Sequence, residues 1–326
     1  MIISKTPYRI SFFGGGSDYP QWFNQHKGAV LSATINKYIY ISCRKLPNFF
    51  SHNYRIVWSK IENVNHVNQI SHNVVRESLK YFRFKEPLEI HYDGDLPAGS
   101  GIASSSSFVV GLLHNIFRFN KKNISKKELY EKSIHFEQNV LKEVVGIQDQ
   151  IAVACGGFNE INFHKKNIKI NPIKMSKNIK LLNKNLLLIY TGIQRTANDI
   201  ASSYVTKLNS SHNSTALKEI VNHVTEAKNI LKTNHIDDFG KLLRESWDLK
   251  KSLSKSITNK KIDELYNLCL ENGALGGKLL GAGGGGFMII YLKHKFQKKF
   301  LKKYNKIVNV PFKFENAGSD IILDEK

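Results

Sequence analysis

The chain has 326 residues, of which 41% are hydrophobic and 11% aromatic, so it can bury a core in one large domain or in two of ordinary size. Its formal net charge is +21, but the lysines are spread over nearly every segment, which favours an anionic small molecule over nucleic acid as the partner. No apolar run has transmembrane length, no signal-peptide core opens the sequence, and Cys43, Cys155 and Cys269 are far apart. These features argue against a membrane protein or a disulfide scaffold and predict a cytoplasmic protein.

An apolar strand-like stretch, residues 8–13, leads into three glycines, Gly14 to Gly16, which are followed by Ser17 and Asp18. Glycines let a backbone come close to a ligand. Arg9 and Asp18 flank them, and these residue types recognise phosphate or carboxylate and sugar hydroxyls, respectively. Taken alone, the segment is better explained as a hairpin turn in which Asp18 bonds its own backbone.

The next part of the chain alternates strand-like and helical patterns. Strand-like runs occupy residues 29–35, 38–43, 54–59 and 88–92. Asn36 and Lys37 separate the first two runs, and residues 72–82 have helical spacing. Trp58 can stack on a base, but packing against the core is the better expectation.

A glycine- and serine-rich loop joins residues 88–92 to an apolar helix that ends near Phe117. The N-terminus of such a helix carries unpaired N–H groups and the positive end of the helix dipole, so it attracts phosphate. Gly99 and Gly101 remove side chains where the backbone must approach a ligand, and Ser104 to Ser107 can cap the helix, bind a phosphate oxygen or reach a metal. The loop has neither the Walker A lysine nor the Rossmann fingerprint, so we expect phosphate binding of another design.

Polar residues on the following helices are further candidates. Ser125 to Glu128 form a capping box that opens a helix containing Glu137. The run Gln148-Asp149-Gln150 lies between apolar residues, which indicates a polar cluster aimed into a site. A surface charge explains Glu137 equally well, and an N-cap is the alternative for Asp149. A lysine- and asparagine-rich stretch, residues 165–185, then separates two halves of the chain.

The second half begins with a buried strand and ends with a glycine-rich loop. The strand, residues 186–190, leads into Arg195. Amphipathic helices are expected at residues 214–232, 237–254 and 261–271. The loop Gly281 to Gly286 feeds a second buried strand, residues 287–292, which indicates a backbone pressed against a ligand or another loop. A last helix and a strand-like stretch at 308–315 follow.

The three glycine-rich segments, in this order and at these separations, resemble the galacto-, homoserine-, mevalonate- and phosphomevalonate-kinase (GHMP kinase) superfamily. Residues 9–18, 146–150 and 190–195 are most similar to its D-glycero-D-manno-heptose 7-phosphate kinase branch. The resemblance implies an α+β fold with a ribosomal-protein-S5-domain-2-like N-terminal, ATP-binding domain in residues 1–180. It implies a ferredoxin-like C-terminal domain in residues 181–326, with the site between the two.

The resemblance also implies a reaction. That branch uses ATP to phosphorylate the anomeric C1 hydroxyl of D-glycero-α-D-manno-heptose 7-phosphate, giving the 1,7-bisphosphate for nucleotide-activated heptose and bacterial surface polysaccharide. The implied partners are ATP, Mg²⁺ and a phosphorylated sugar, without nucleic acid or membrane, and a homodimer is left possible. Because L-fucose kinases share a similar first motif, fucose is the alternative substrate. A non-catalytic protein that kept the fold and a nucleic-acid-binding protein are the alternatives from other classes.

The resemblance also implies roles for individual residues, where their positions match those of the family's motifs. Asp149 matches the carboxylate that accepts or orients the proton of the substrate hydroxyl, and Arg9 is the second implied catalytic residue. Ser105 and Glu137 match the Mg²⁺ ligands, although the run of serines leaves the choice among residues 104–106 open. The positions implied to bind ATP are Gly99, Ser100, Gly101, Ile102, Ala103, Ser104, Ser105, Ser106, Trp58 and Ser59. The positions implied to bind the sugar are Arg9, Gly15, Gly16, Ser17, Asp18, Gln148, Asp149, Gly283, Gly284 and Arg195.

Overall fold

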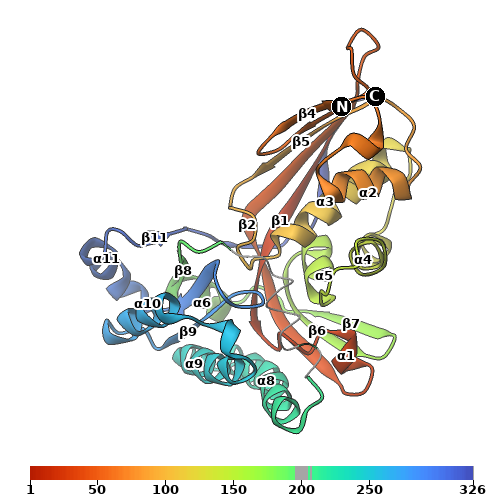
Figure 1. The fold of residues 1–326 in the computed structure, drawn as a ribbon. Helices are drawn as coiled ribbons and strands as arrows, with labels where there is room; N and C mark the ends of the chain where they lie inside the picture. The colour runs from red at the N-terminus through yellow and green to blue at the C-terminus, as the bar shows by residue number, and fades with distance from the viewer. Residues whose placement is uncertain (195–204, 206–207, 326) are drawn as a thin grey trace.

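The structure is a computed structural model that describes residues 1–194, 205 and 208–325 (Figure 1). The strands of its larger sheet are β1 (Ile2–Phe13), β2 (Gly28–Lys45), β3 (Tyr54–Val57), β4 (Ile61–Val64), β5 (Leu88–Gly94), β6 (Phe158–His164), β7 (Asn167–Pro172), β12 (Phe314–Glu315) and β13 (Asp320–Asp324). Their order is β13-β1-β2-β5-β3-β4, with β12 and β6 also paired to β2 and β7 paired to β6. The long strands β1 and β2 therefore form the centre of the sheet.

Strand β2 is continuous where the sequence predicted two strands separated by Asn36 and Lys37. In the β1–β2 ladder, Pro7 lies opposite Tyr38 and Tyr8 lies opposite Ile35. The polar pair therefore forms a bulge opposite Pro7, which has no N–H group to donate to the ladder. Asn36 also exchanges hydrogen bonds with Lys313: its Oδ1 accepts from the lysine N–H at 2.6 Å, and its own N–H donates to the lysine carbonyl at 2.9 Å. These bonds replace the missing ladder contacts, so the strand does not end there.

Helices cover one face of the larger sheet (Figure 1). The helical segments of the N-terminal part are α1 (Pro20–Phe23), η1 (Val67–Gln69), α2 (Asn73–Tyr81), α3 (Ser104–Phe119), α4 (Lys126–His135), the π-helix η2 (Phe136–Val140) and α5 (Gln148–Cys155). The next helix, α6 (Lys177–Asn185), lies beside the smaller sheet (Figure 1), where Asn185 Nδ2 donates to the hydroxyl of Tyr291 at 2.9 Å. Helix α3 is buried on nearly all sides and packs against β1, β2, α4 and α5. Its Asn115 donates to the Ile41 carbonyl at 2.7 Å, and its Ser107 donates to the Pro7 carbonyl at 2.9 Å. Side-chain hydrogen bonds thus fix the direction of α3, and with it the position of its N-terminus.

The second half of the chain forms a smaller sheet with its own helices. The strands are β8 (Leu186–Tyr190), β9 (Gly276–Leu279), β10 (Phe287–Tyr291) and β11 (Val308–Asn309), and the helices are α8 (Ser211–Ile230), α9 (Asp237–Ser252), η3 (Lys255–Ile257), α10 (Lys260–Glu271) and α11 (His294–Lys303). The strand order β11-β8-β10-β9 with antiparallel pairing is that of a ferredoxin-like β-α-β-β-α-β unit. The expected two-part α+β architecture is therefore confirmed.

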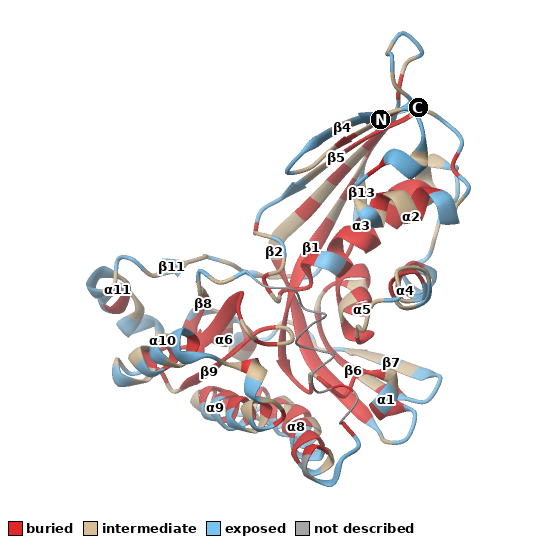
Figure 2. Ribbon diagram, viewed as in Figure 1, coloured by how far each residue is buried: buried red, intermediate tan, exposed pale blue. Residues whose placement is uncertain are grey.

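The end of the chain returns to the first sheet. Strand β12 pairs with β2 and β13 pairs with β1, so this last segment joins the larger sheet although it follows the smaller one in sequence. The predicted division at residues 180 and 181 did not anticipate this return, because two- and five-residue strands carry almost no periodic signal. Figure 2 shows buried residues running through β1, β2 and α3. Within the described part of the chain, no helix is both long and apolar enough to cross a membrane.

Candidate active site

A cleft of about 390 Å³ lies where the two halves of the chain meet. It is bordered by the loop after β1, the loop before α3, the segment before α5, and residues of α9, β9 and the loop after β9. The predicted site residues that line it are Arg9, Gly15, Gly16, Asp18, Gly99, Gly101, Ala103, Ser104, Ser105, Ser106, Gln148 and Asp149. Tertiary structure thus brings together side chains that are separated by up to 140 residues in sequence.

Arg9 and Asp149 form a bidentate ion pair in this cleft. The Nε of Arg9 donates to Asp149 Oδ1, and its Nη2 donates to Oδ2, each at 2.8 Å. The arginine side chain is 3% exposed, whereas that of Asp149 is 25% exposed. The third arm of the guanidinium, Nη1, donates to the carbonyl of Gly101 at 2.9 Å. Since the fork is rigid, Arg9 fixes the carboxylate relative to the loop before α3 while leaving one side of it open to the cleft.

The N-terminus of α3 opens into the same cleft without a side-chain cap. Its N-cap residue, Ala103, has φ +67° and makes no capping hydrogen bond, and Ser105 in the first turn is exposed. The Oγ of Ser104 accepts from the Gly99 N–H at 3.2 Å, which closes the loop on itself. A non-glycine residue in the left-handed region is strained, and such strain is found at ligand-binding turns. The free N–H groups of a 16-residue helix make this a suitable site for phosphate.

The loop before α3 interlocks with the glycine-rich loop after β9. A Cβ on Gly101, where φ is +78°, would lie 2.4 Å from the carbonyl oxygen of Leu280. A Cβ on Gly281 would lie 2.6 Å from the Cα of Gly101. The N–H of Phe287 further donates to the Ser100 carbonyl at 2.9 Å. The polyglycine loop therefore presses against the loop before α3, which is the loop-to-loop contact that the sequence offered as one of two explanations.

Gly101→Ala is expected to lower the free energy of unfolding by about 1–3 kcal/mol and to weaken ATP binding, since the methyl group meets backbone atoms in a strained conformation. Urea denaturation and calorimetric ATP titration measure the two effects. Gly192→Ala is the matched control, because Gly192 has φ +74° and no atom of the described residues lies within 4 Å of the added Cβ. Equal losses of stability and of ATP affinity in both variants would mean that the strained backbone conformation, and not the contact between the two loops, causes them.

Glu137 lies behind the cleft on η2, fully buried. Ser106 Oγ is 3.0 Å from its Oε1 and 3.1 Å from its Oε2, and Gln150 Nε2 donates to Oε2. Burial, with the charge of Glu143 nearby, raises the pKa of Glu137 to about 8. The structure thus brings Ser106 to Glu137, whereas the predicted partner Ser105 faces solvent. On a helix that begins at Ser104, adjacent residues point about 100° apart, so only one of the two serines can face η2.

The donor set around Glu137 fits a hard divalent cation. It consists of carboxylate and hydroxyl oxygens, the ligands that Mg²⁺ prefers. The Oε1 of Gln150 is buried beside them, and no described residue donates a hydrogen bond to it. A fully buried carboxylate with a raised pKa would be stabilised by a cation. Glu137, Ser106 and the amide oxygen of Gln150 are the residues able to hold one.

The stability of the metal-free protein is expected to fall as pH rises from 4.5 to about 8. In this interval folded Glu137 keeps a proton that the unfolded chain has lost, so the folded state binds more protons and each rise in pH favours unfolding. Glu137→Gln cannot ionise and is expected to remove this part of the slope. Denaturant unfolding of both proteins across this pH range, with a chelator present, measures it. An unchanged slope in the variant would contradict a buried, protonated Glu137.

Asp18 holds the glycine loop and the segment before α5 together. Its Oδ1 accepts from the Gly16 N–H at 3.0 Å, and its backbone carbonyl accepts from Ile147 N–H at 3.0 Å. A Cβ on Gly146 would lie 1.9 Å from Asp18 Oδ2, so only glycine fits there. Burial, together with the charge of Asp149, raises the pKa of Asp18. The hairpin interpretation of Asp18 is thus correct in part, because the residue bonds its own loop while lining the cleft.

Three charged residues of the cleft were not predicted. Lys278, on β9, donates to the carbonyls of Ser11 at 3.2 Å and Phe12 at 2.7 Å, and burial and the charge of Arg9 lower its pKa to about 7. Lys250, on α9, donates to the Gly281 carbonyl, and Glu143 precedes α5. Lys278 could have been predicted from the sequence, because it lies just before the last glycine-rich loop. No motif in the sequence singles out Lys250 or Glu143.

Several predicted residues lie outside the lining of the cleft. Trp58 Nε1 donates to Glu62 at 2.8 Å and its ring packs edge-on against His72, as the packing interpretation expected, and Ser59 is exposed. Gly283 and Gly284 pack against Ile257, and the Gly284 N–H donates to its carbonyl at 2.8 Å. The remaining positions, Ser17, Ser100 and Ile102, are buried in the loops that support the cleft. Arg195 lies outside the described residues.

Comparisons with known proteins agree with this architecture. The family signature of the GHMP kinases N terminal domain matches residues 65–157, and that of the GHMP kinases C terminal domain matches residues 227–306. The chain is 30% identical to the D-glycero-alpha-D-manno-heptose 7-phosphate kinase of Campylobacter jejuni, over 94% of this chain and 92% of that protein. It is 24% identical to the galactokinase of Thermotoga petrophila, over 97% of each chain. A D-glycero-D-manno-heptose 1-phosphate kinase from Bacteroides thetaiotaomicron has the same fold, with a TM-score of 0.79, 22% identity and full coverage of both chains.

The fold, the cleft between its halves and these likenesses define a small-molecule kinase. The chain belongs to the GHMP kinase family, and it is an ATP-dependent phosphotransferase that acts on an alcohol group.

Proposed function

We propose that the chain transfers the γ-phosphoryl group of ATP to the anomeric C1 hydroxyl of D-glycero-α-D-manno-heptose 7-phosphate, forming the 1,7-bisphosphate for GDP-heptose and surface-polysaccharide synthesis. The observation that carries the proposal is the carboxylate of Asp149, held by the buried Arg9 in one cleft with the N-terminus of α3. The likeness to the Campylobacter heptose 7-phosphate kinase over nearly the whole chain supports the choice of sugar.

Each side chain has a defined part in this reaction. Asp149 takes the proton of the C1 hydroxyl as the oxygen forms a bond to the γ-phosphorus and the bond to the β-phosphate oxygen breaks. An anomeric hydroxyl is more acidic than an ordinary alcohol, so a carboxylate suffices as base. Arg9 holds the carboxylate of Asp149 in a fixed direction, and the backbone N–H groups at residues 99–106 hold the phosphates of ATP.

Glu137 and Ser106 are proposed to hold Mg²⁺. When bound, Mg²⁺ neutralises charge on the β- and γ-phosphates. Asp18 and Gln148 are proposed to bind sugar hydroxyls, because both line the cleft and present oxygen and amide groups there. Among the described residues that line the cleft, the basic ones are Arg9, Lys250 and Lys278, and these are proposed as the groups available to contact the phosphates of ATP and of a phosphorylated sugar.

A substrate panel tests the proposal. ATP consumption with Mg²⁺ is measured against heptose 7-phosphate, the unphosphorylated heptose, L-fucose, galactose and mevalonate. Turnover restricted to the 7-phosphate is expected, with a 1,7-bisphosphate as product. Turnover with fucose instead would keep the mechanism and change the substrate. ATP binding without any turnover would leave a non-catalytic member of the family, and salt-sensitive retention on DNA would indicate a nucleic-acid-binding protein.

We also propose that the reaction takes place in the cytoplasm, where ATP is available. The three cysteines support this proposal, because all of them are free thiols, as is usual in a reducing compartment. The fold is compatible with a homodimer, and analytical sedimentation would measure the oligomeric state.

A further inference from the structure

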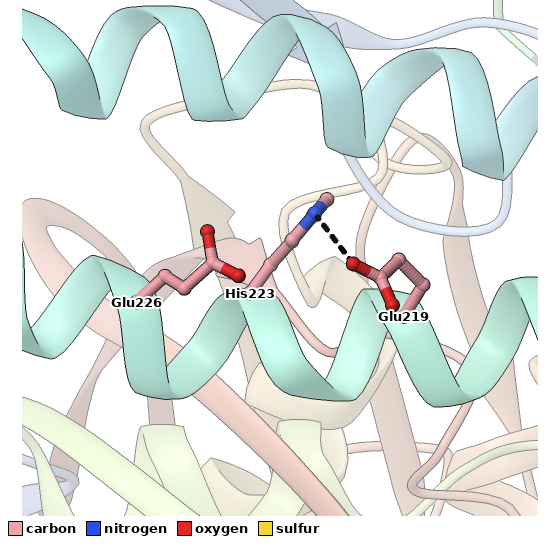
Figure 3. Close-up of side chains that lie close together, drawn as sticks. All are labelled: Glu219, His223 and Glu226. Atoms are coloured by element: carbon pink, nitrogen blue, oxygen red, sulfur yellow. Dashed lines mark ion pairs between the residues drawn. The ribbon is translucent and has the colours of Figure 1, made fainter.

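Three potential metal ligands lie on one side of α8 (Figure 3), and none of the three is among the residues that line the cleft. Glu219, His223 and Glu226 are four and three residues apart, a spacing that puts successive side chains on the same face of a helix. Each offers one ligand atom, and these atoms lie within 4.8 Å of one another. Two carboxylates separated by two helical turns thus converge on the imidazole between them.

The imidazole of His223 is buried and incompletely paired. His223 is 3% exposed, and its ring packs edge-on against Phe13 with a centroid distance of 6.4 Å. Its Nε2 lies 3.9 Å from Glu219 Oε1, as the dashed line in Figure 3 marks. No described residue forms a hydrogen bond with its Nδ1, which is also buried. Since a buried polar atom without a partner is costly, the described residues leave this ring incompletely satisfied, and Nε2, the nitrogen that faces Glu219, has there a contact of 3.9 Å, longer than a hydrogen bond.

The two glutamates also lack the partners that this chain could readily provide. The sequence has 48 lysines and arginines against 27 acidic residues. Yet among the described residues neither Glu219 nor Glu226 forms an ion pair with a lysine or arginine. Within the described part of the chain, Glu219 accepts a hydrogen bond from Asn222 at 3.3 Å and contacts His223, and no other polar partner of its carboxylate is found there. Two like charges next to a buried imidazole are therefore left without a cation.

We propose that Glu219, His223 and Glu226 bind a zinc-class divalent cation. One imidazole nitrogen and two carboxylate oxygens form a mixed N,O set, which suits Zn²⁺ and its first-row neighbours, whereas all-oxygen sets suit Mg²⁺. Three protein ligands leave a fourth position for water. Both glutamates are exposed at their tips, so they can rotate onto the ion while the packed His223 stays in place.

The ion has a structural consequence. Helix α8 packs against β1 and β2, and its Leu217 Cδ1 lies 3.2 Å from the position that a Cβ on Gly16 would occupy. The ring of His223 packs against Phe13, the last residue of β1, so holding the ring in place would tie α8 to the strand that leads directly into the glycine loop of the cleft. We therefore expect bound Zn²⁺ to raise thermal stability without taking part in the phosphoryl transfer.

Metal titration of the purified full chain tests this site. Metal-stripped protein is titrated with Zn²⁺ by calorimetry and with Co²⁺ by visible absorption, in excess Mg²⁺ to occupy the all-oxygen site. One equivalent is expected to bind. The variant Glu219→Gln/Glu226→Gln is expected to lose at least about 10-fold in affinity, because even second-shell changes cost about 10–100-fold. Its Mg²⁺-dependent turnover is expected to match that of the wild type.

The matched control is Glu264→Gln/Glu271→Gln on α10. These two glutamates are exposed and have the same seven-residue spacing, but Leu268 stands where α8 has its histidine. The control removes the same charge and is expected to bind Zn²⁺ as the wild type does. Absence of Zn²⁺ binding by the wild type, or equal affinity in the Glu219→Gln/Glu226→Gln variant, would overturn the proposal. Because the exposed glutamates carry no core packing, loss of folding does not confound the result.

Discussion

Asp149→Asn is expected to lower kcat by about 10²–10⁴-fold, the usual contribution of a positioned general base, while ATP affinity changes little. Asparagine keeps the size of the side chain and one oxygen for the Arg9 fork, but it cannot take the substrate proton. Alanine would be the poorer test, because it leaves the guanidinium of Arg9, 3% exposed, without its counter-charge. Steady-state kinetics and calorimetric ATP titration measure the two quantities.

Asp248→Asn is the control for this prediction. Asp248 is an exposed aspartate of α9 that pairs with Lys251, and the same change of charge there is expected to leave kcat unchanged. Normal kcat in Asp149→Asn would remove this carboxylate from the chemistry. A large loss of ATP affinity with normal kcat at saturation would assign it to nucleotide binding instead.

Glu137→Gln and Ser106→Ala are expected to raise the Mg²⁺ concentration for half-maximal turnover by about 10-fold or more, the scale of changes at metal sites. Glutamine removes the negative charge that attracts the cation, and alanine removes the hydroxyl that lies 3.0 Å from the Glu137 carboxylate. Mg²⁺ titration of turnover measures the effect, and Mn²⁺ binding followed by magnetic resonance measures the affinity directly.

Ser105→Ala tests which serine binds Mg²⁺: the structure indicates Ser106, whereas the motif indicated Ser105. Ser105 is exposed, and it is Ser106 whose hydroxyl bonds the Glu137 carboxylate, so the loss of Ser105 is expected to leave the Mg²⁺ dependence unchanged. A shift in Ser105→Ala without one in Ser106→Ala would restore Ser105 as the metal ligand. Unchanged titrations in all three variants would move the metal away from Glu137.

Much of the fold was predictable from local patterns. The buried strands at residues 186–190 and 287–292 and the helices at 72–82 and 237–254 are close to β8, β10, α2 and α9. Each has a long periodic pattern or a continuous apolar run, which local physics alone converts into structure. The bulge at Asn36 and the return of β13 to β1 were not predictable, because both depend on a partner strand far away in sequence.

The candidate site was likewise predictable in part. Glycine and serine runs at residues 14–16, 99–107 and 281–286 identified the loops around the cleft, since backbone freedom and hydroxyl chemistry are written in the residue types themselves. Only the tertiary structure selected Ser106 rather than Ser105 as the neighbour of Glu137, because the direction of a helical side chain depends on how the helix is rotated against its neighbours. It likewise added Lys278 to the cleft and joined Arg9 to Asp149, since burial and pairing arise only when distant segments pack together.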